Sequence, residues 1–142
     1  FHERIIEELG KKTPILAMGD FNDEPFDRSL TEHARCERQR AKVVRAKTAT
    51  FLNLMWPLTG RGIGSHYFNN DANLLDQFLA SRSLLTGDGK IAVVENSAGI
   101  ERFPEMAKKG DYPAPIRFGR GKELNVKGFS DHFPISVKLE EA

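Results

Sequence analysis

Apolar positions in the first part of the chain predict a helix followed by a strand. Apolar residues recur with helical spacing in residues 2–9, and Gly10 follows where such a helix would end. The continuous apolar run at residues 15–18 then predicts a buried strand. Because this run leads directly into Asp20, we expect Asp20 at the C-terminal edge of the strand, where open α/β folds place their chemistry.

The rest of the chain predicts further strands separated by loops. Residues 74–81 and 91–95 are apolar or β-branched, and residues 134–139 alternate between apolar and polar, so each predicts a strand. Residues 48–58 are apolar and aromatic and predict a segment of the core. Residues 96–127 are rich in Gly, Pro and charge, which indicates a long loop.

Composition fits one globular domain and leaves several classes of function open. The chain has 142 residues, of which 39% are apolar and 29% are charged, so it can bury a core and is not a disordered tail. A net charge of +1 argues neither for nor against a nucleic-acid partner. The apolar runs are too short to span a membrane, and the lone Cys36 excludes an internal disulfide. Nothing in the chain indicates a cellular compartment.

A basic stretch between Arg35 and Lys47 allows two interpretations. It contains six basic residues against the single acid Glu37: Arg35, Arg38, Arg40, Lys42, Arg45 and Lys47. One interpretation is the solvated face of a helix or edge strand. The other is a phosphate-contacting surface next to a catalytic cleft.

Three short segments place acids, amides and an imidazole at the ends of apolar runs. They are Gly-Asp-Phe-Asn-Asp at 19–23, Leu-Asp-Gln at 75–77 and Ser-Asp-His-Phe-Pro at 130–134. Gathered in one cleft, they would supply a metal ligand, a proton-transfer group and a side chain to position each. That set of groups suits metal-assisted hydrolysis of a phosphate ester.

Asp76 is the acid whose position most needs an explanation. It interrupts an apolar strand, where an unpaired carboxylate is costly to bury. His132 precedes a predicted strand and can present its ring to Asp76, which would orient the imidazole and favour its protonated form. The alternative is a purely structural role for Asp76, as a buried ion pair or as an acceptor for backbone amides.

The other two segments also have a chemical and a structural interpretation. Asp20 and Asn22 are two residues apart and can face the same side, so that the acid orients water and the amide holds a phosphate oxygen. The same residues are typical of an Asx turn at the end of a strand. Asp131 and His132 diverge in an extended segment, so that one can face a metal ion while the other faces Asp76 or phosphate.

Taken together, the three segments resemble the second half of the endonuclease/exonuclease/phosphatase family, which includes the DNase I-like nucleases. Their order and even spacing carry the resemblance: 56 positions from Asp20 to Asp76, then 55 to Asp131. The resemblance implies that Asp20 activates water, that Asn22 binds phosphate and that Asp76 pairs with a phosphate-contacting His132. It implies that Asp131, with Asp20, binds Mg²⁺ or Mn²⁺. Gln77 stands where many relatives have His or Tyr.

The resemblance also implies a fold and a domain boundary. The family fold is a four-layer α/β/β/α sandwich, to which this chain would supply about one sheet with its flanking helices. Residues 1–142 would then be the C-terminal portion of a single domain, whose metal-binding Glu lies in a preceding half. We therefore expect the isolated chain to be inactive, and to self-associate or bind that half. Val93, Ile135, Val137 and residues 51–56 are the candidates for the apolar surface involved.

The expected function is divalent-metal-dependent hydrolysis of a phosphodiester by an activated water, with nucleic acid as the leading substrate. One alternative is the same chemistry on a lipid or small phosphate, as in a phosphoinositide phosphatase or a sphingomyelinase. Another, of a different class, is a noncatalytic binding or scaffold module that keeps the fold.

Overall fold

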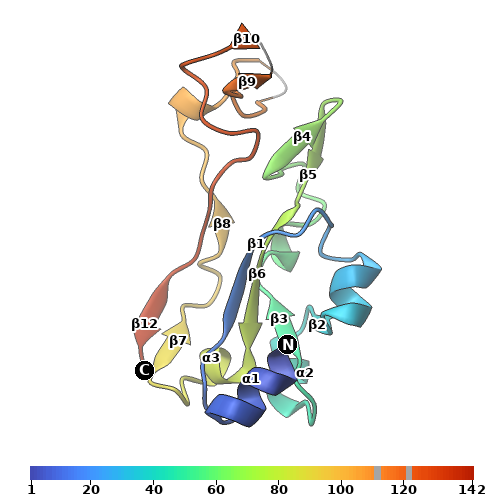
Figure 1. Ribbon diagram of the computed structural model, residues 1–142, viewed down its shortest axis with the longest axis vertical. Coiled ribbons are helices and arrows are strands. Elements are labelled where there is room, and N and C mark those ends of the chain that lie inside the picture. The colour runs from blue at the N-terminus through green and yellow to red at the C-terminus, as the bar shows by residue number, and fades with distance from the viewer. Residues whose placement is uncertain (111–112, 121–122) are drawn as a thin grey trace.

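A computed structural model describes residues 1–110, 113–120 and 123–142 and shows a four-stranded sheet with further elements on both of its faces (Figure 1). The helical elements are α1 (His2–Leu9), η1 (Ser29–His33), α2 (Arg40–Arg45), η2 (Trp56–Leu58), α3 (Arg82–Thr86) and η3 (Pro104–Met106). The first six strands are β1 (Leu16–Asp20), β2 (Cys36–Glu37), β3 (Phe51–Asn53), β4 (His66–Phe68), β5 (Asp71–Asn73) and β6 (Asp76–Ser81). The others are β7 (Ile91–Val93), β8 (Gly99–Ile100), β9 (Gly119–Arg120), β10 (Glu123–Leu124), β11 (Ile135–Ser136) and β12 (Leu139–Glu141).

The four-stranded sheet has the order β1-β6-β3-β2. Strand β6 runs antiparallel to β1 and β3, and β2 pairs parallel to β3. In the β1–β6 register, Asp20 lies opposite Asp76, so the end of one strand and the start of the other meet at the same edge. This register alone brings the first two polar segments of the chain together.

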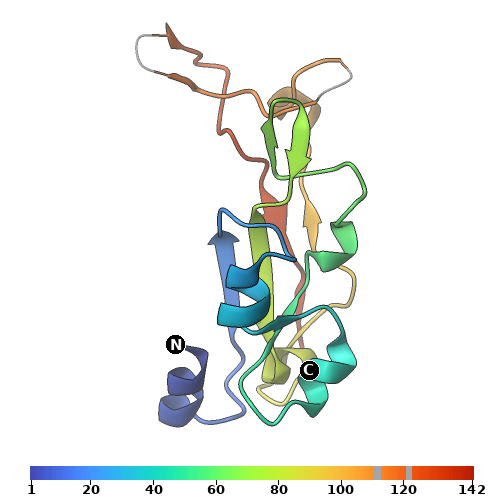
Figure 2. The same ribbon diagram turned by 90° about the vertical axis from the view of Figure 1, so that its right-hand side faces the viewer.

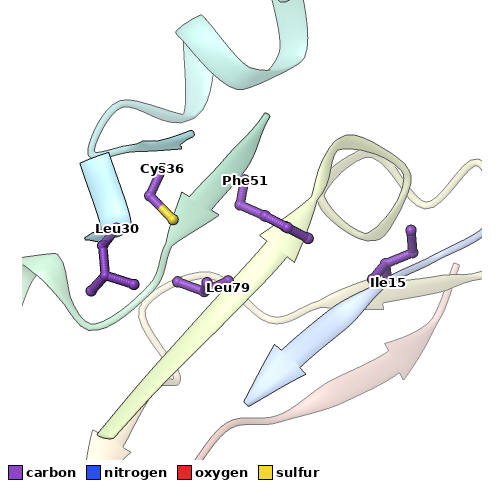
Figure 3. Packing of buried hydrophobic residues seen from close by; sticks show 5 residues of the cluster. All are labelled: Ile15, Leu30, Cys36, Phe51 and Leu79. Atoms are coloured by element: carbon purple, nitrogen blue, oxygen red, sulfur yellow. The ribbon is translucent and has the colours of Figure 1, made fainter. Parts of the chain in front are cut away.

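One face of the sheet is covered by α1 and the region of η1. Leu79 of β6 points to this face and packs with four other buried residues, Ile15, Leu30, Cys36 and Phe51 (Figure 3). Ile5 and Ile6 of α1 pack against this cluster, which explains their helical spacing. Leu9, predicted on the same face, is instead 70% exposed.

The opposite face is covered by α2, α3 and a two-stranded ribbon (Figure 2). Phe78 and Ala80 point to it, as expected for strand positions that alternate with Leu79. The ribbon pairs β7 with β12 and β8 with β11, both antiparallel. Val137 packs here with residues of the sheet, so the two layers share a core.

The predicted strand at 134–139 is interrupted, and Ser97 is the reason. Its hydroxyl accepts a hydrogen bond from the backbone N–H of Lys138 at 3.0 Å, in place of a backbone carbonyl of the paired strand. The ladder therefore divides into β11 and β12. The predicted long loop at 96–127 also contains short elements: β8, η3 and, within the described residues, parts of β9 and β10.

Two expectations about exposure are wrong. Met18, in the run predicted to be a buried strand, is 68% exposed, because β1 is an edge strand of this sheet. Val93, Phe51 and Met55, which were candidates for an exposed apolar surface, are buried within the chain itself. Phe51 is covered on the α1 face of the sheet, and Val93 and Met55 belong to the clusters on the opposite face, so the chain itself buries all three.

The other main predictions of the fold are confirmed. The helix at 2–9 ends at Gly10, which has a φ of 97°, and strands are present within 74–81 and 91–95. The mixed α/β class is confirmed, whereas the four-layer sandwich stays a prediction. None of the helices in the described ranges is long and apolar enough to cross a membrane.

Candidate active site

The site lies where β1 ends and β6 begins, at the edge of the sheet that faces the β4–β5 hairpin (Figure 1). Asp20 and Asp76 are register partners there. The backbone N–H of Phe21 donates to the carbonyl of Leu75 at 2.9 Å, so the pairing of these two segments continues beyond β1 and β6. The two carboxylates are therefore fixed by main-chain hydrogen bonds.

The third polar segment joins this edge through the hairpin. The backbone N–H of Phe133 donates to the carbonyl of Ser65 at 2.7 Å, and His66 and His132 form an antiparallel β-bridge. The hydroxyl of Ser65, which is fully buried, accepts from the backbone N–H of Asp76 at 3.2 Å. The start of β4 thus holds the His132 segment and the start of β6 together.

His132 and Asp76 form the shortest side-chain contact of the site. The distance from His132 Nδ1 to Asp76 Oδ2 is 2.7 Å, and the two side chains are 20% and 13% exposed. A carboxylate at Nδ1 fixes the orientation of the ring and places the other nitrogen, Nε2, toward the rest of the site. That nitrogen lies 3.9 Å from Asp20 Oδ2, beyond hydrogen-bond distance.

Asp20 and Asn22 form the Asx turn that was the structural interpretation of this segment. The backbone N–H of Asn22 donates to Asp20 Oδ1 at 2.8 Å, and Asn22 has a left-handed φ of 54°. Asn tolerates this conformation better than most residues. The turn occupies one oxygen of Asp20 and leaves Oδ2, the oxygen nearest His132, free of that bond. The turn and a chemical role for Asp20 are therefore compatible.

Asp131 lies on the other side of His132 and is exposed. Among the residues that the structure describes, two groups of side chains could each hold a metal ion, with ligand atoms within 4.8 Å of one another. One group is Asp20, Asp76 and His132, and the other is His66, Asp131 and His132. His132 belongs to both groups, whereas the expected metal ligands Asp20 and Asp131 belong to one group each.

His66 is a part of the site that the sequence did not indicate. Its ring lies against that of His132, with centroids 4.7 Å apart and an angle of 39° between the planes. Burial lowers the pKa of His66 below its ordinary value, and the nearby His132 and Arg117 act in the same direction, while Asp131 and Asp20 oppose it. Arg117 Nη2 lies 3.3 Å from His66 Nε2. The imidazole of His66 is therefore biased toward its neutral form.

Gln77 and Glu24 hold the loops around the site, although neither was expected to. Gln77 is fully buried, and its amide donates to the carbonyls of Asp23 at 3.0 Å and Leu74 at 2.6 Å. Its oxygen accepts from the side-chain amide of Asn53 at 3.0 Å. Glu24 Oε1 accepts from the backbone N–H of Leu74 at 2.8 Å. These buried amide bonds give Gln77 a supporting role next to Asp76.

The basic stretch at 35–47 does not lie next to this site. It forms β2 and α2, and Val43 of α2 packs on Leu84 of α3, which follows the far end of β6 (Figure 2). Its last part lines a cavity of about 800 Å³ beside α1 rather than the Asp20 edge. Several of its cations are engaged in exposed ion pairs: Arg35 with Glu3, Arg40 with Glu95 and Lys42 with Glu37. The interpretation as a phosphate surface next to the cleft is therefore wrong.

Comparison with known proteins identifies one family. The sequence profile described as Endonuclease/Exonuclease/phosphatase family matches residues 3–141. No curated protein and no solved structure gives a significant match to the chain.

Proposed function

Because the chain belongs to the endonuclease/exonuclease/phosphatase family, whose members are generally phosphoesterase- or nuclease-type hydrolases, we propose that its site hydrolyses phosphodiesters with the help of a divalent cation. The observation that supports this most is the 2.7 Å contact of His132 Nδ1 with Asp76, in a site that holds two further carboxylates. Catalysis explains why an acid stands within an apolar strand and why its partner is an imidazole.

In this proposal the Asp76–His132 pair serves the phosphate. Asp76 accepts the Nδ1 proton and keeps Nε2 of His132 directed into the site, and it stabilises the imidazolium. The protonated ring then donates a hydrogen bond from Nε2 to a phosphoryl oxygen, on which negative charge grows as the transition state forms. Removing one such donor typically costs on the order of 10²–10³ in rate.

Asp20 and Asn22 serve the attacking water and the substrate. Oδ2 of Asp20 is free of the Asx-turn bond and can accept a proton from a water molecule as it attacks phosphorus. The side-chain amide of Asn22 is exposed and can donate to a phosphate oxygen. The left-handed turn at Asn22 places this amide directly beyond the strand end.

The donor set of the site fits a hard divalent cation. Asp131 and Asp20 offer carboxylate oxygens, which Mg²⁺ and Mn²⁺ prefer, and members of the family commonly use divalent metals. A bound cation would supply Lewis-acid polarisation of the phosphoryl group. In this arrangement Asp131 would hold the cation, while Asp20, which belongs to the other group of possible ligands, would face the water.

Nucleic acid is the leading substrate class, although the basic stretch no longer supports it. The same residues could hydrolyse the phosphate ester of a lipid or a small molecule, as a phosphoinositide phosphatase or sphingomyelinase does. A scaffold that has lost catalysis is the candidate of another class, and the paired Asp76 and His132 argue against it, since a scaffold has no use for an oriented imidazole.

A substrate panel with and without metal tests the proposal. The panel holds single- and double-stranded DNA, RNA, a phosphoinositide, sphingomyelin and a chromogenic diester, each with Mg²⁺, Mn²⁺ or a chelator. Asp76→Asn, assayed on the same panel, serves as the inactive control. We expect metal-dependent cleavage of nucleic acid, lost in the variant. Absence of turnover on every substrate would instead favour the scaffold.

A further inference from the structure

We propose that Arg117 is a phosphate-binding residue of this site and that His66 is the positioning residue that holds it there. The inference deepens the proposed function and rests on it, because it names a group that would contact the same anionic substrate. Neither residue belongs to the three segments that indicated the site in the sequence.

The contact between the two side chains determines which proton His66 carries. Arg117 Nη2 lies 3.3 Å from His66 Nε2. A guanidinium has N–H donors and no acceptor, so a hydrogen bond at this contact requires Nε2 as the acceptor and the ring proton on Nδ1, which has no partner among the described residues. One N–H of Arg117 is used in this contact, and its remaining N–H groups can still bind an anion.

His66 places Arg117 beside the imidazole that we assign to the phosphate. The rings of His66 and His132 are 4.7 Å apart, and the β-bridge between the two residues fixes their backbones as well. The guanidinium of Arg117 thus lies at the Nε2 edge of an imidazole whose ring lies against that of His132. A phosphate bound at His132 Nε2 would lie near it.

The backbone of Arg117 is fixed next to the loop that leads to His132. The N–H of Phe129 donates to the carbonyl of Ile116 at 3.0 Å, and the N–H of Ile116 donates to the carbonyl of Met106 at 2.7 Å. A Cβ atom on Gly128 would clash with the backbone carbonyl oxygen of Arg117. Glycine at this position therefore allows the chain at Arg117 to pack directly on the 128–132 segment.

The charges of the site make a permanent cation useful there. Three carboxylates, Asp20, Asp76 and Asp131, lie around His132 and would repel a phosphate diester. Arg117 counters that repulsion and its planar fork suits two phosphate oxygens at once. Arg102, by comparison, lies over the ring of Phe133 at 5.5 Å, in a cation–π contact with a residue of the core.

Binding of inorganic phosphate to the metal-free chain tests the assignment without turnover. The titration is followed by NMR through the ring signals of His132 and His66. We expect saturable binding to the wild-type chain, weakened about tenfold or more in Arg117→Ala and less in Arg117→Lys, since a charged hydrogen bond contributes roughly one to two powers of ten in affinity. Arg102→Ala is the matched control and should bind phosphate as the wild type does. The ¹⁵N shifts of His66 should report a neutral ring with its proton on Nδ1.

Variants of His66 separate positioning from a general loss of structure. His66→Gln keeps an acceptor for Arg117 and should retain most of the phosphate affinity. His66→Phe keeps a ring but no acceptor, so it should lose as much phosphate affinity as Arg117→Ala does.

No phosphate binding to the wild type, equal losses in Arg102→Ala and Arg117→Ala, or a His66 proton on Nε2 would each overturn the proposal. If phosphate binds through Arg117 but no ester is hydrolysed in the substrate panel, the binding role stands and the hydrolase proposal fails. If Arg117→Ala hydrolyses substrate with its phosphate affinity and KM unchanged, the hydrolase proposal stands and the binding role of Arg117 fails.

Discussion

His132 and Asp131 are neighbours in the chain that we expect to serve different partners. The imidazole is held by Asp76 at 2.7 Å and serves the phosphate, while the exposed carboxylate serves the cation. In the protein that shows turnover, His132→Ala should lower kcat by about 10²–10⁴ with the Mg²⁺ requirement unchanged. Asp131→Asn should instead raise the Mg²⁺ concentration that gives half-maximal rate. A Mg²⁺ titration of both variants on one diester separates the roles, with the exposed His33→Ala as control; identical metal dependence would contradict them.

His2 should make the stability of the fold depend on pH. Its ring stacks on Phe51 with centroids 3.9 Å apart, and both of its nitrogens are buried with no partner among the described residues. Burial lowers its pKa below the ordinary value of 6.5. The unfolded chain therefore takes up a proton near pH 6.5 that the folded chain does not, so stability is present above that pH and is lost as pH falls below it.

The measurement is urea unfolding of the wild type and His2→Phe at pH 7.5 and at pH 5.5. The variant keeps a stacked ring but cannot be protonated, so its free energy of unfolding should fall less between the two pH values. Some dependence should remain, because the pKa of His66 is lowered as well. His33→Phe, at an exposed histidine, should leave the wild-type dependence unchanged.

The β4–β5 hairpin is the element that assembles the site, and a single glycine sets its position. A Cβ atom on Gly64 would lie 2.5 Å from the backbone N and O of Asn73, where no flexible side chain can yield. Gly64→Ala should therefore displace Ser65 and His66 and destabilise the fold by about 1–3 kcal/mol. Gly99→Ala is the matched control, since Gly99 lies in the β8–β11 pair but has nothing within 4 Å of its Cβ position.

Chemical denaturation of both variants, with NMR of the His132 ring, checks this prediction. A stability equal to that of the wild type in Gly64→Ala, with an unchanged His132 signal, would mean that the hairpin does not fix the site.

The importance of this hairpin also explains what the sequence could and could not predict. The sequence predicts Asp20 and Asp76 as site residues because each lies next to an apolar run, which is a local pattern. His66 joins the site through its bridge to His132, 66 positions away, and Arg117 joins it through its contact with His66, 51 positions away; no local pattern marks such contacts. The Lys138 N–H bond to Ser97 is likewise long-range, which is why the break in the last predicted strand was missed.

On the scale of the whole molecule, no strand in the described part of the chain pairs with the outer edge of β1. Strand β1 pairs with β6 on one side and forms the end of the four-stranded sheet, and Met18 at its middle is 68% exposed. An unpaired edge with an apolar side chain is a template for a further strand. This edge, rather than Val93 or Val137, is now our candidate for the surface at which the chain associates.

We therefore expect the isolated chain to self-associate at high concentration through this edge. Met18→Lys should shift it toward the monomer, because a charge on an edge strand opposes pairing with a second copy. Phe26→Lys is the matched control: Phe26 is 54% exposed but lies outside the strands, so the same change of charge should leave association as it is. Size-exclusion chromatography with light scattering over a range of concentrations measures both. A wild-type chain that is monomeric throughout, or an equal effect of the two substitutions, would show that this edge is not the contact.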